Sequence, residues 1–97
     1  MPTQKAVVTA LIGLHARPAA VFVRAVTETG LPVTITRAGV KDVDARSLLQ
    51  VMTADFYHGC EVELGIAESA LDGPLSREKA QDALRTLGQL LESQGAA

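Results

Sequence analysis

Hydrophobic positions along the chain follow a period of two in some segments and a period near 3.6 in others, and these segments predict seven elements. Within 61–66, acids or glycine alternate with aliphatic residues, as in a strand with one face in water. Within 16–29, apolar residues recur at i, i+3, i+4 and i+7, as on the buried face of a helix. Strands are therefore predicted over 5–11, 32–37, 40–43 and 61–66, and helices over 16–29, over 48–52 and from an N-cap at Ser76 up to a frayed end at 94–97.

Turn and cap residues separate these elements and give their order. Gly30 suits the C-terminal cap of the first helix, and Pro32 prevents that helix from continuing. Ala38-Gly39 is typical of a turn between antiparallel strands, and Ser47 suits the N-cap of the short helix. The resulting order, β-α-β-β-α-β-α, predicts a four-stranded antiparallel sheet with three helices on one face, which is an α+β open-faced β-sandwich.

The composition is that of a globular chain whose core is built from aliphatic side chains. The 97 residues suffice for one modest core, and only 3% of them are aromatic. The single cysteine, Cys60, excludes an internal disulfide, suits a reducing cytoplasm and is expected to be buried and inert. No apolar run approaches the ~18 residues of a membrane span, so we expect a cytoplasmic protein without membrane insertion. The two histidines have no ligand-like spacing, and we expect neither a metal nor a cofactor.

Charge is distributed unevenly between the two halves of the sequence. A net charge of −2 argues against a partner made of nucleic acid. Residues 1–46 carry a charge of +3 and residues 47–97 a charge of −5. A positive first half fits an acceptor of phosphate or of an acidic partner, although ordinary scatter of surface charge explains the same values.

One histidine stands where the first predicted strand gives way to the first predicted helix. His15 takes the N-cap position, and Pro18 fits the first turn because an N–H there has no intrahelical partner. The free amides of that turn and the Arg17 guanidinium form a site for an anion, phosphate in particular. An imidazole beside such a site is suited to carry a phosphoryl group. An ordinary surface or capping histidine is the alternative, and spacing alone leaves both open.

The segment Gly13-Leu14-His15-Ala16-Arg17-Pro18-Ala19 resembles the active-site signature of HPr, the histidine-containing phosphocarrier of the phosphoenolpyruvate:sugar phosphotransferase system. The chain length, the element order, the serine that opens the short helix and the segment Gly59-Cys60-Glu61 also resemble that family. The resemblance covers nearly the whole chain. It implies a single HPr-like domain over residues 1–97.

The resemblance implies a phosphoryl relay rather than a standalone enzyme. In the family, a histidine accepts the phosphoryl group through Nδ1 from phosphorylated Enzyme I and passes it to Enzyme II (IIA) domains during sugar uptake. Carried onto this chain, His15 is the phosphorylated residue and Arg17 its companion. Ala16 and Arg17, at the helix start, would bind the phosphoryl oxygens.

The resemblance also implies a docking surface for Enzyme I and Enzyme II on the first two helices. That surface would be an apolar patch rimmed by cations, and the protein would dock as a monomer. Its members are Ala20, Arg24, Leu48, Leu49 and Met52. Core packing is the alternative for the leucines and the methionine.

Two further features concern regulation. Ser47 matches the serine that a dedicated kinase phosphorylates in some members of the family, and a purely structural N-cap is the alternative. The segment 54–58 departs from the small apolar stretch usual there, which puts regulation and partner choice in question.

Three other functions remain open from the sequence. A regulatory paralogue, such as one of the nitrogen-related branch, would use the same chemistry with different partners. A non-transferring interaction domain would take no phosphoryl group at all. A free-standing hydrolase would need a second acid or base near His15, and the sequence places none there.

Overall fold

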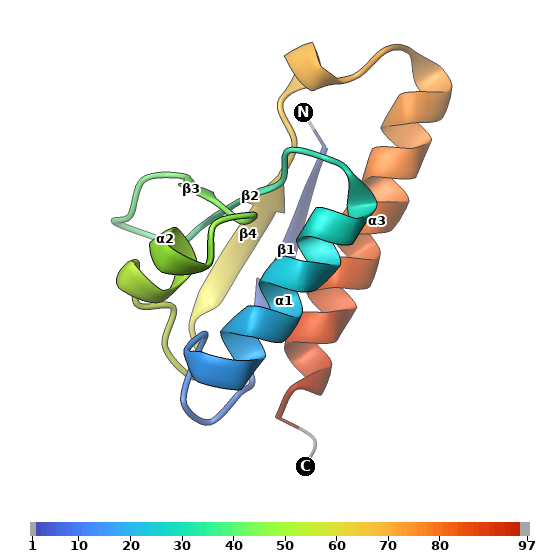
Figure 1. Cartoon of the computed structure of the whole chain (residues 1–97). Helices are drawn as coiled ribbons and strands as arrows, with labels where there is room; N and C mark the ends of the chain where they lie inside the picture. The colour runs from blue at the N-terminus through green and yellow to red at the C-terminus, as the bar shows by residue number, and fades with distance from the viewer. Residues whose placement is uncertain (1, 96–97) are drawn as a thin grey trace.

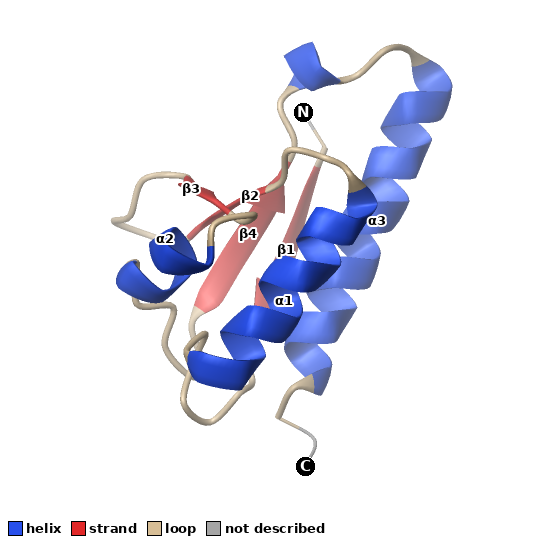
Figure 2. Cartoon of the chain, viewed as in Figure 1, coloured by secondary structure: helices blue, strands red, loops and turns tan. Residues whose placement is uncertain are grey.

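Four antiparallel strands form one open sheet in the order β1-β4-β2-β3, and three α-helices cover one of its faces (Figures 1 and 2). The computed structural model describes residues 2–95, apart from the side chains of 74 and 75. Its elements are β1 (Thr3–Val7), α1 (Ala16–Thr29), β2 (Thr34–Thr36), β3 (Val43–Asp44), α2 (Leu48–Thr53), β4 (Glu61–Gly65), the 3-10 helix η1 (Glu68–Ala70) and α3 (Pro74–Ser93). The predicted fold class, element order and antiparallel sheet are confirmed.

Several predicted boundaries differ from those of the structure. β1 ends at Val7 rather than at residue 11, although Val8 still exchanges backbone hydrogen bonds with Gly59 and Cys60 at 2.7 and 2.9 Å. β3 spans only two residues. α3 begins at Pro74 with Gly73 as its N-cap, so the prediction of Ser76 at that position is wrong. Proline at the first helical position is pre-organised for a helix start, and here it outweighs the serine.

The core lies between the sheet and the helices, as the periodicity predicts. In β4 and just beyond it, Val62, Leu64 and Ile66 are buried, while Glu61 and Glu63 point to the other face. The helices contribute Ala19, Phe22 and Val26 from α1, and Ala80, Leu84, Leu87 and Leu91 from α3. These side chains belong to one continuous cluster of buried residues, in line with a core made chiefly of aliphatic groups.

Helix α3 packs closely along β1, and one glycine makes this approach possible. A Cβ added at Gly88 would lie 3.1 Å from Cγ of Gln4 and 3.6 Å from Cβ of Ala6. Gly88 weakens the helix by about 1 kcal/mol relative to alanine, but its missing Cβ lets α3 pack close to β1. Gln81 and Glu92 of α3 also hydrogen-bond backbone groups of β1, and so cover the edge of the sheet.

The C-terminal segment returns to the start of α1. Gln94 donates a hydrogen bond to the carbonyl oxygen of Pro18 at 3.0 Å, and the amide of Gly95 donates one to Thr9 at the same distance. Helix α3 ends at Ser93, before the segment predicted to fray, and these bonds tie 94 and 95 to the rest of the fold, while 96–97 lie outside the described residues. Within residues 2–95, no helix combines the length and the apolar character needed to cross a membrane.

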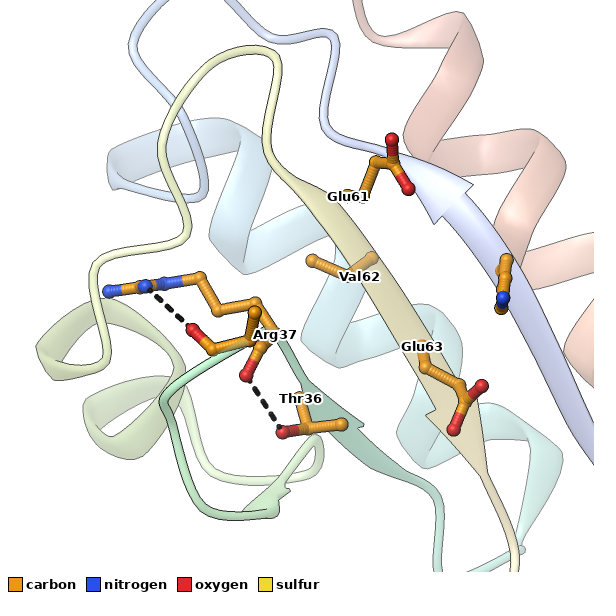
Figure 3. Close-up of a pocket in the computed structure, with 7 residues that line it drawn as sticks. Thr36, Arg37, Glu61, Val62 and Glu63 are labelled. Atoms are coloured by element: carbon orange, nitrogen blue, oxygen red, sulfur yellow. Dashed lines mark hydrogen bonds between the residues drawn. The ribbon is translucent and has the colours of Figure 1, made fainter.

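The uncovered face of the sheet carries charges of both signs. Lys5, Thr36, Arg37, Glu61 and Glu63 line a shallow depression there (Figure 3). Figure 3 shows Glu61 and Glu63 on β4 and Arg37 at the end of β2, with its guanidinium directed away from both acids. Neither His15 nor Arg17 lines this depression, so the residues singled out by the sequence lie elsewhere.

Candidate functional site

The loop before α1 is held against the loop after α2, although some 40 residues separate them in sequence. The amide of Leu14 donates a hydrogen bond to the carbonyl oxygen of Phe56 at 2.8 Å, and both side chains are fully buried. Gly13 has φ +73, and a Cβ on it would lie 2.6 Å from that same oxygen. Only glycine fits this position, and the tight contact fixes the backbone that leads into His15.

His15 takes the N-cap position of α1 in extended backbone, with φ −130 and ψ 161. Its side chain accepts no hydrogen bond from the helix amides, so the ring does not serve as the cap. The side chain is 36% exposed. The ring is therefore neither turned into the core nor used to satisfy the helix, and another protein can reach it.

The first turn of α1 offers hydrogen-bond donors to an anion. The amide of Ala19 bonds the carbonyl oxygen of His15 at 3.5 Å, and Pro18 has no N–H. The amides of Ala16 and Arg17 find no acceptor within residues 2–95, and the exposed Arg17 guanidinium forms no ion pair with any of those residues. The start of α1 therefore offers two free amides and the positive end of a helix, and Arg17 adds an exposed cation in the same turn.

Asp55 is the neighbour of His15 that sequence reasoning did not identify. Its Oδ1 lies 3.3 Å from Nε2 of the imidazole, and its side chain is 68% exposed. Asp55 has φ 57, a left-handed conformation that aspartate tolerates better than most residues. The only signal in the sequence was the unusual segment 54–58, which did not indicate contact with the histidine.

The residues predicted to meet partners lie on the adjacent helices α1 and α2. Ala20 and Arg24 are exposed on α1, and Arg24 lies within 3.9 Å of Glu28 one turn later. Leu48 is 40% and Leu49 78% exposed. Met52 is half-buried and packs against the core. The core-packing alternative therefore describes Met52, whereas the two leucines face solvent.

Ser47 is the N-cap of α2. Its Oγ accepts a hydrogen bond from the amide of Gln50 at 3.2 Å, which confirms the predicted structural role. The preceding Arg46 pairs with Asp44 at 3.0 Å and lowers the pKa of that carboxyl. The half-buried serine hydroxyl is thus already engaged in a helix cap.

The remaining candidates of the sequence lie apart from the start of α1 or show no contact with His15 in the described residues. Tyr57 and His58 are exposed, and the Arg37 guanidinium lies 5.4 Å from the centre of the Tyr57 ring. Cys60 is buried, and burial raises the pKa of its thiol. In the described part of the chain, no group of three or more potential ligands is arranged to hold a metal ion.

An open-faced α+β sandwich with a half-exposed histidine at a helix start, beside free amides and an arginine, defines a class of small phosphocarrier domains. The comparisons agree with that class. The family model described as the PTS HPr component phosphorylation site matches residues 2–93. The chain belongs to the HPr family of phosphocarrier proteins of the phosphotransferase system.

Individual relatives show how far the similarity extends. The phosphocarrier protein HPr of Streptomyces coelicolor is 45% identical over 65 residues, which cover 67% of this chain and 70% of that protein. The phosphocarrier protein HPr of Vibrio cholerae is 31% identical over 83 residues, covering 86% and 91%. The crystal structure of HPr-C-His from Thermoanaerobacter tengcongensis has a TM-score of 0.79 at 26% identity, covering 100% of this chain and 98% of that one.

Proposed function

We propose that this protein accepts a phosphoryl group on His15 from phosphorylated Enzyme I and passes it to an Enzyme II (IIA) component during sugar uptake. The observation that carries the proposal is the half-exposed imidazole at the start of α1. Within residues 2–95, Nδ1 of that ring has no hydrogen-bond partner, so no other described residue occupies the position that phosphorus would take. The proposal assigns residues 1–97 to one HPr-like domain that acts as a cytoplasmic monomer.

The chemistry needs a nucleophile and stabilisation of charge, and the start of α1 supplies both. During an in-line transfer, the amides of Ala16 and Arg17 and the Arg17 guanidinium would face the phosphoryl oxygens. A helix terminus contributes about 0.3–1 kcal/mol, and up to about 2 when partly buried. This modest attraction suits a carrier, because a tightly held phosphoryl group would not be passed on.

The docking surface follows from the exposure of α1 and α2. Helices α1 and α2 pack against each other, α1 with exposed Arg17, Ala20 and Arg24 and α2 with exposed Leu48 and Leu49, which would give an apolar centre with a positive border. We propose that acidic faces of Enzyme I and Enzyme II with apolar centres dock there. Met52 contributes less than predicted because it is half-buried.

Phosphorylation by a cognate Enzyme I with phosphoenolpyruvate tests the proposal. Wild-type protein and His58→Ala should gain one acid-labile, base-stable phosphate, while His15→Ala should gain none. His58 is the matched control because it is an exposed histidine. A non-transferring interaction domain predicts no phosphate on any variant, and a hydrolase predicts inorganic phosphate without a labelled protein. Comparing Enzyme I of the sugar branch with that of a nitrogen-related branch distinguishes the two carrier functions.

Regulatory phosphorylation of Ser47 is a separate proposal. The hydroxyl precedes α2, and a phosphate there would gain from the positive end of the helix but would disturb the existing cap. Incubation with a kinase specific for this serine and ATP, followed by mass spectrometry, should place the added mass on Ser47. The same treatment should leave Ser47→Ala unmodified.

A further inference from the structure

The contact between Asp55 and His15 joins two loops that the fold clamps together. Nε2 of the imidazole lies 3.3 Å from Oδ1 of the carboxylate. Leu14 precedes His15 and Phe56 follows Asp55, and the amide of Leu14 donates a hydrogen bond to the carbonyl oxygen of Phe56. The contact is made by exposed side chains, but a backbone hydrogen bond between the adjacent residues holds their two loops together.

The chemistry of the two groups determines which nitrogen of the ring carries the proton. An ionised carboxylate can only accept a hydrogen bond, so the ring must donate from Nε2. In a neutral imidazole with its proton on Nε2, the lone pair is on Nδ1. No residue within 2–95 donates to Nδ1, so that lone pair is free.

We propose that Asp55 is a positioning residue that holds His15 in the Nε2–H tautomer and thereby makes Nδ1 the nucleophile. This inference rests on the proposed function of His15 as the phosphoryl acceptor. It adds a residue from the loop after α2 to a site otherwise built from the start of α1.

The carboxylate also has a role once the phosphoryl group has arrived. The Nδ1 lone pair of His15 forms the new N–P bond, while the N–P bond of the donor phosphohistidine breaks and its electron pair returns to the donor imidazole. The proton on Nε2 stays in place, so the phosphorylated ring of His15 carries a positive charge. Asp55 lies next to that proton and offsets the charge, much as a carboxylate supports an imidazolium in a catalytic triad.

Two substitutions remove the carboxylate without endangering the fold. Asp55 has φ 57, and both glycine and asparagine adopt this conformation readily. Asp55→Gly removes the side chain, and Asp55→Asn keeps its size but not its charge. Asp72→Asn is the matched control, since Asp72 is an exposed acid in the segment between η1 and α3.

The nitrogen-15 chemical shifts of the two ring nitrogens report the tautomer directly. At a pH where the ring is neutral, wild-type protein and Asp72→Asn should show a protonated Nε2 and an unprotonated Nδ1. In Asp55→Gly, the ratio of the two tautomers should fall by about two- to fivefold, the range expected for an exposed charged pair. Unchanged shifts in both Asp55 variants would overturn the proposal.

Phosphorylation kinetics separate this proposal from the proposed function. With Enzyme I and phosphoenolpyruvate, Asp55→Gly should accept phosphate about two- to fivefold more slowly, at an unchanged half-saturating concentration of Enzyme I. A changed tautomer with an unchanged rate would refute a role for Asp55 in the transfer. A changed tautomer in a chain whose wild-type form accepts no phosphate would refute the proposed function but support the ring assignment.

Discussion

Substituting Gly13 with alanine should strain the contact that places His15. The new Cβ would lie 2.6 Å from the carbonyl oxygen of Phe56 and 3.0 Å from Cα of Tyr57. Both are backbone atoms, so neither can rotate away as the end of a flexible side chain could. The loops must separate, which weakens the hydrogen bond between the amide of Leu14 and Phe56.

The magnitude follows from two separate costs. The first cost is that of the left-handed backbone: alanine at φ +73 costs about 1–2 kcal/mol, because its Cβ approaches the carbonyl oxygen that follows it in the chain. Overpacking against the Phe56 carbonyl adds about 1–3 kcal/mol. A total of about 2–5 kcal/mol should lower Tm by at least about 8 °C in a domain of this size.

Gly39→Ala is the control for the backbone cost. Gly39 has φ +82, but a Cβ there would have no atom within 4 Å. Thermal and urea unfolding followed by circular dichroism should show a loss of only about 1–2 kcal/mol for Gly39→Ala. Of the two variants, only Gly13→Ala should also slow the phosphorylation of His15. Equal losses of stability in the two variants would show that the contact with Phe56 is not tight, and the argument for how His15 is placed would fail.

Three other predictions concern the cap, an ion pair and the thiol. Ser47→Ala should lose about 1 kcal/mol in urea unfolding, because the amide of Gln50 loses its acceptor. Arg77 holds the pKa of Glu68 at about 2, below the ordinary 4.5, so the pair stabilises the fold above about pH 4.5 and loses this effect as the pH falls toward 2. Glu68→Gln should therefore have a lower Tm than wild-type protein at pH 7, and this difference should shrink as the pH falls toward 2. Cys60 should react slowly with iodoacetamide in the folded protein, because burial raises the pKa of its thiol.

Each of these predictions has a control and a contradicting result. Ser69→Ala is the control for the cap, because Ser69 lies in η1 and not at the start of α2. An equal loss of stability in both serine variants would argue against the cap. A constant difference in Tm between wild-type protein and Glu68→Gln from pH 7 to pH 2 would contradict the lowered pKa. For Cys60, urea should restore fast alkylation, and fast alkylation without urea would contradict burial.

The fold could be predicted because its elements are encoded locally. The apolar stripe that includes Phe22 and the alternation around Val62 each repeat within one segment, and burial follows that repeat. Element ends were harder to place, because neighbouring residues give competing signals. Ser76 is a good N-cap by itself, but Gly73 and Pro74 start the helix earlier. The placement of Gln94 and Gly95 depends on contacts with Pro18 and Thr9, which lie far away in sequence.

In the candidate site, too, some features follow from local sequence and others depend on packing between distant segments. The position of His15 at the start of α1 and the free amides after it follow from a short stretch of sequence. The neighbouring carboxylate does not, because Asp55 is 40 residues away and reaches the ring only through packing of the two loops. Gly13 is the link between the local and the distant parts, since its lack of a Cβ permits that packing.

In the proposed mechanism the two parts of the site act on the same imidazole ring. The helix start and Arg17 would attract the dianion that is carried on Nδ1. On the Nε2 side, Asp55 favours the proton and the positive ring charge that a phosphoryl group on Nδ1 creates, but it also repels the dianion itself. Because these effects partly cancel, the site would bind the phosphoryl group without trapping it. A carrier needs this balance, since it must release to one protein the group that it accepted from another.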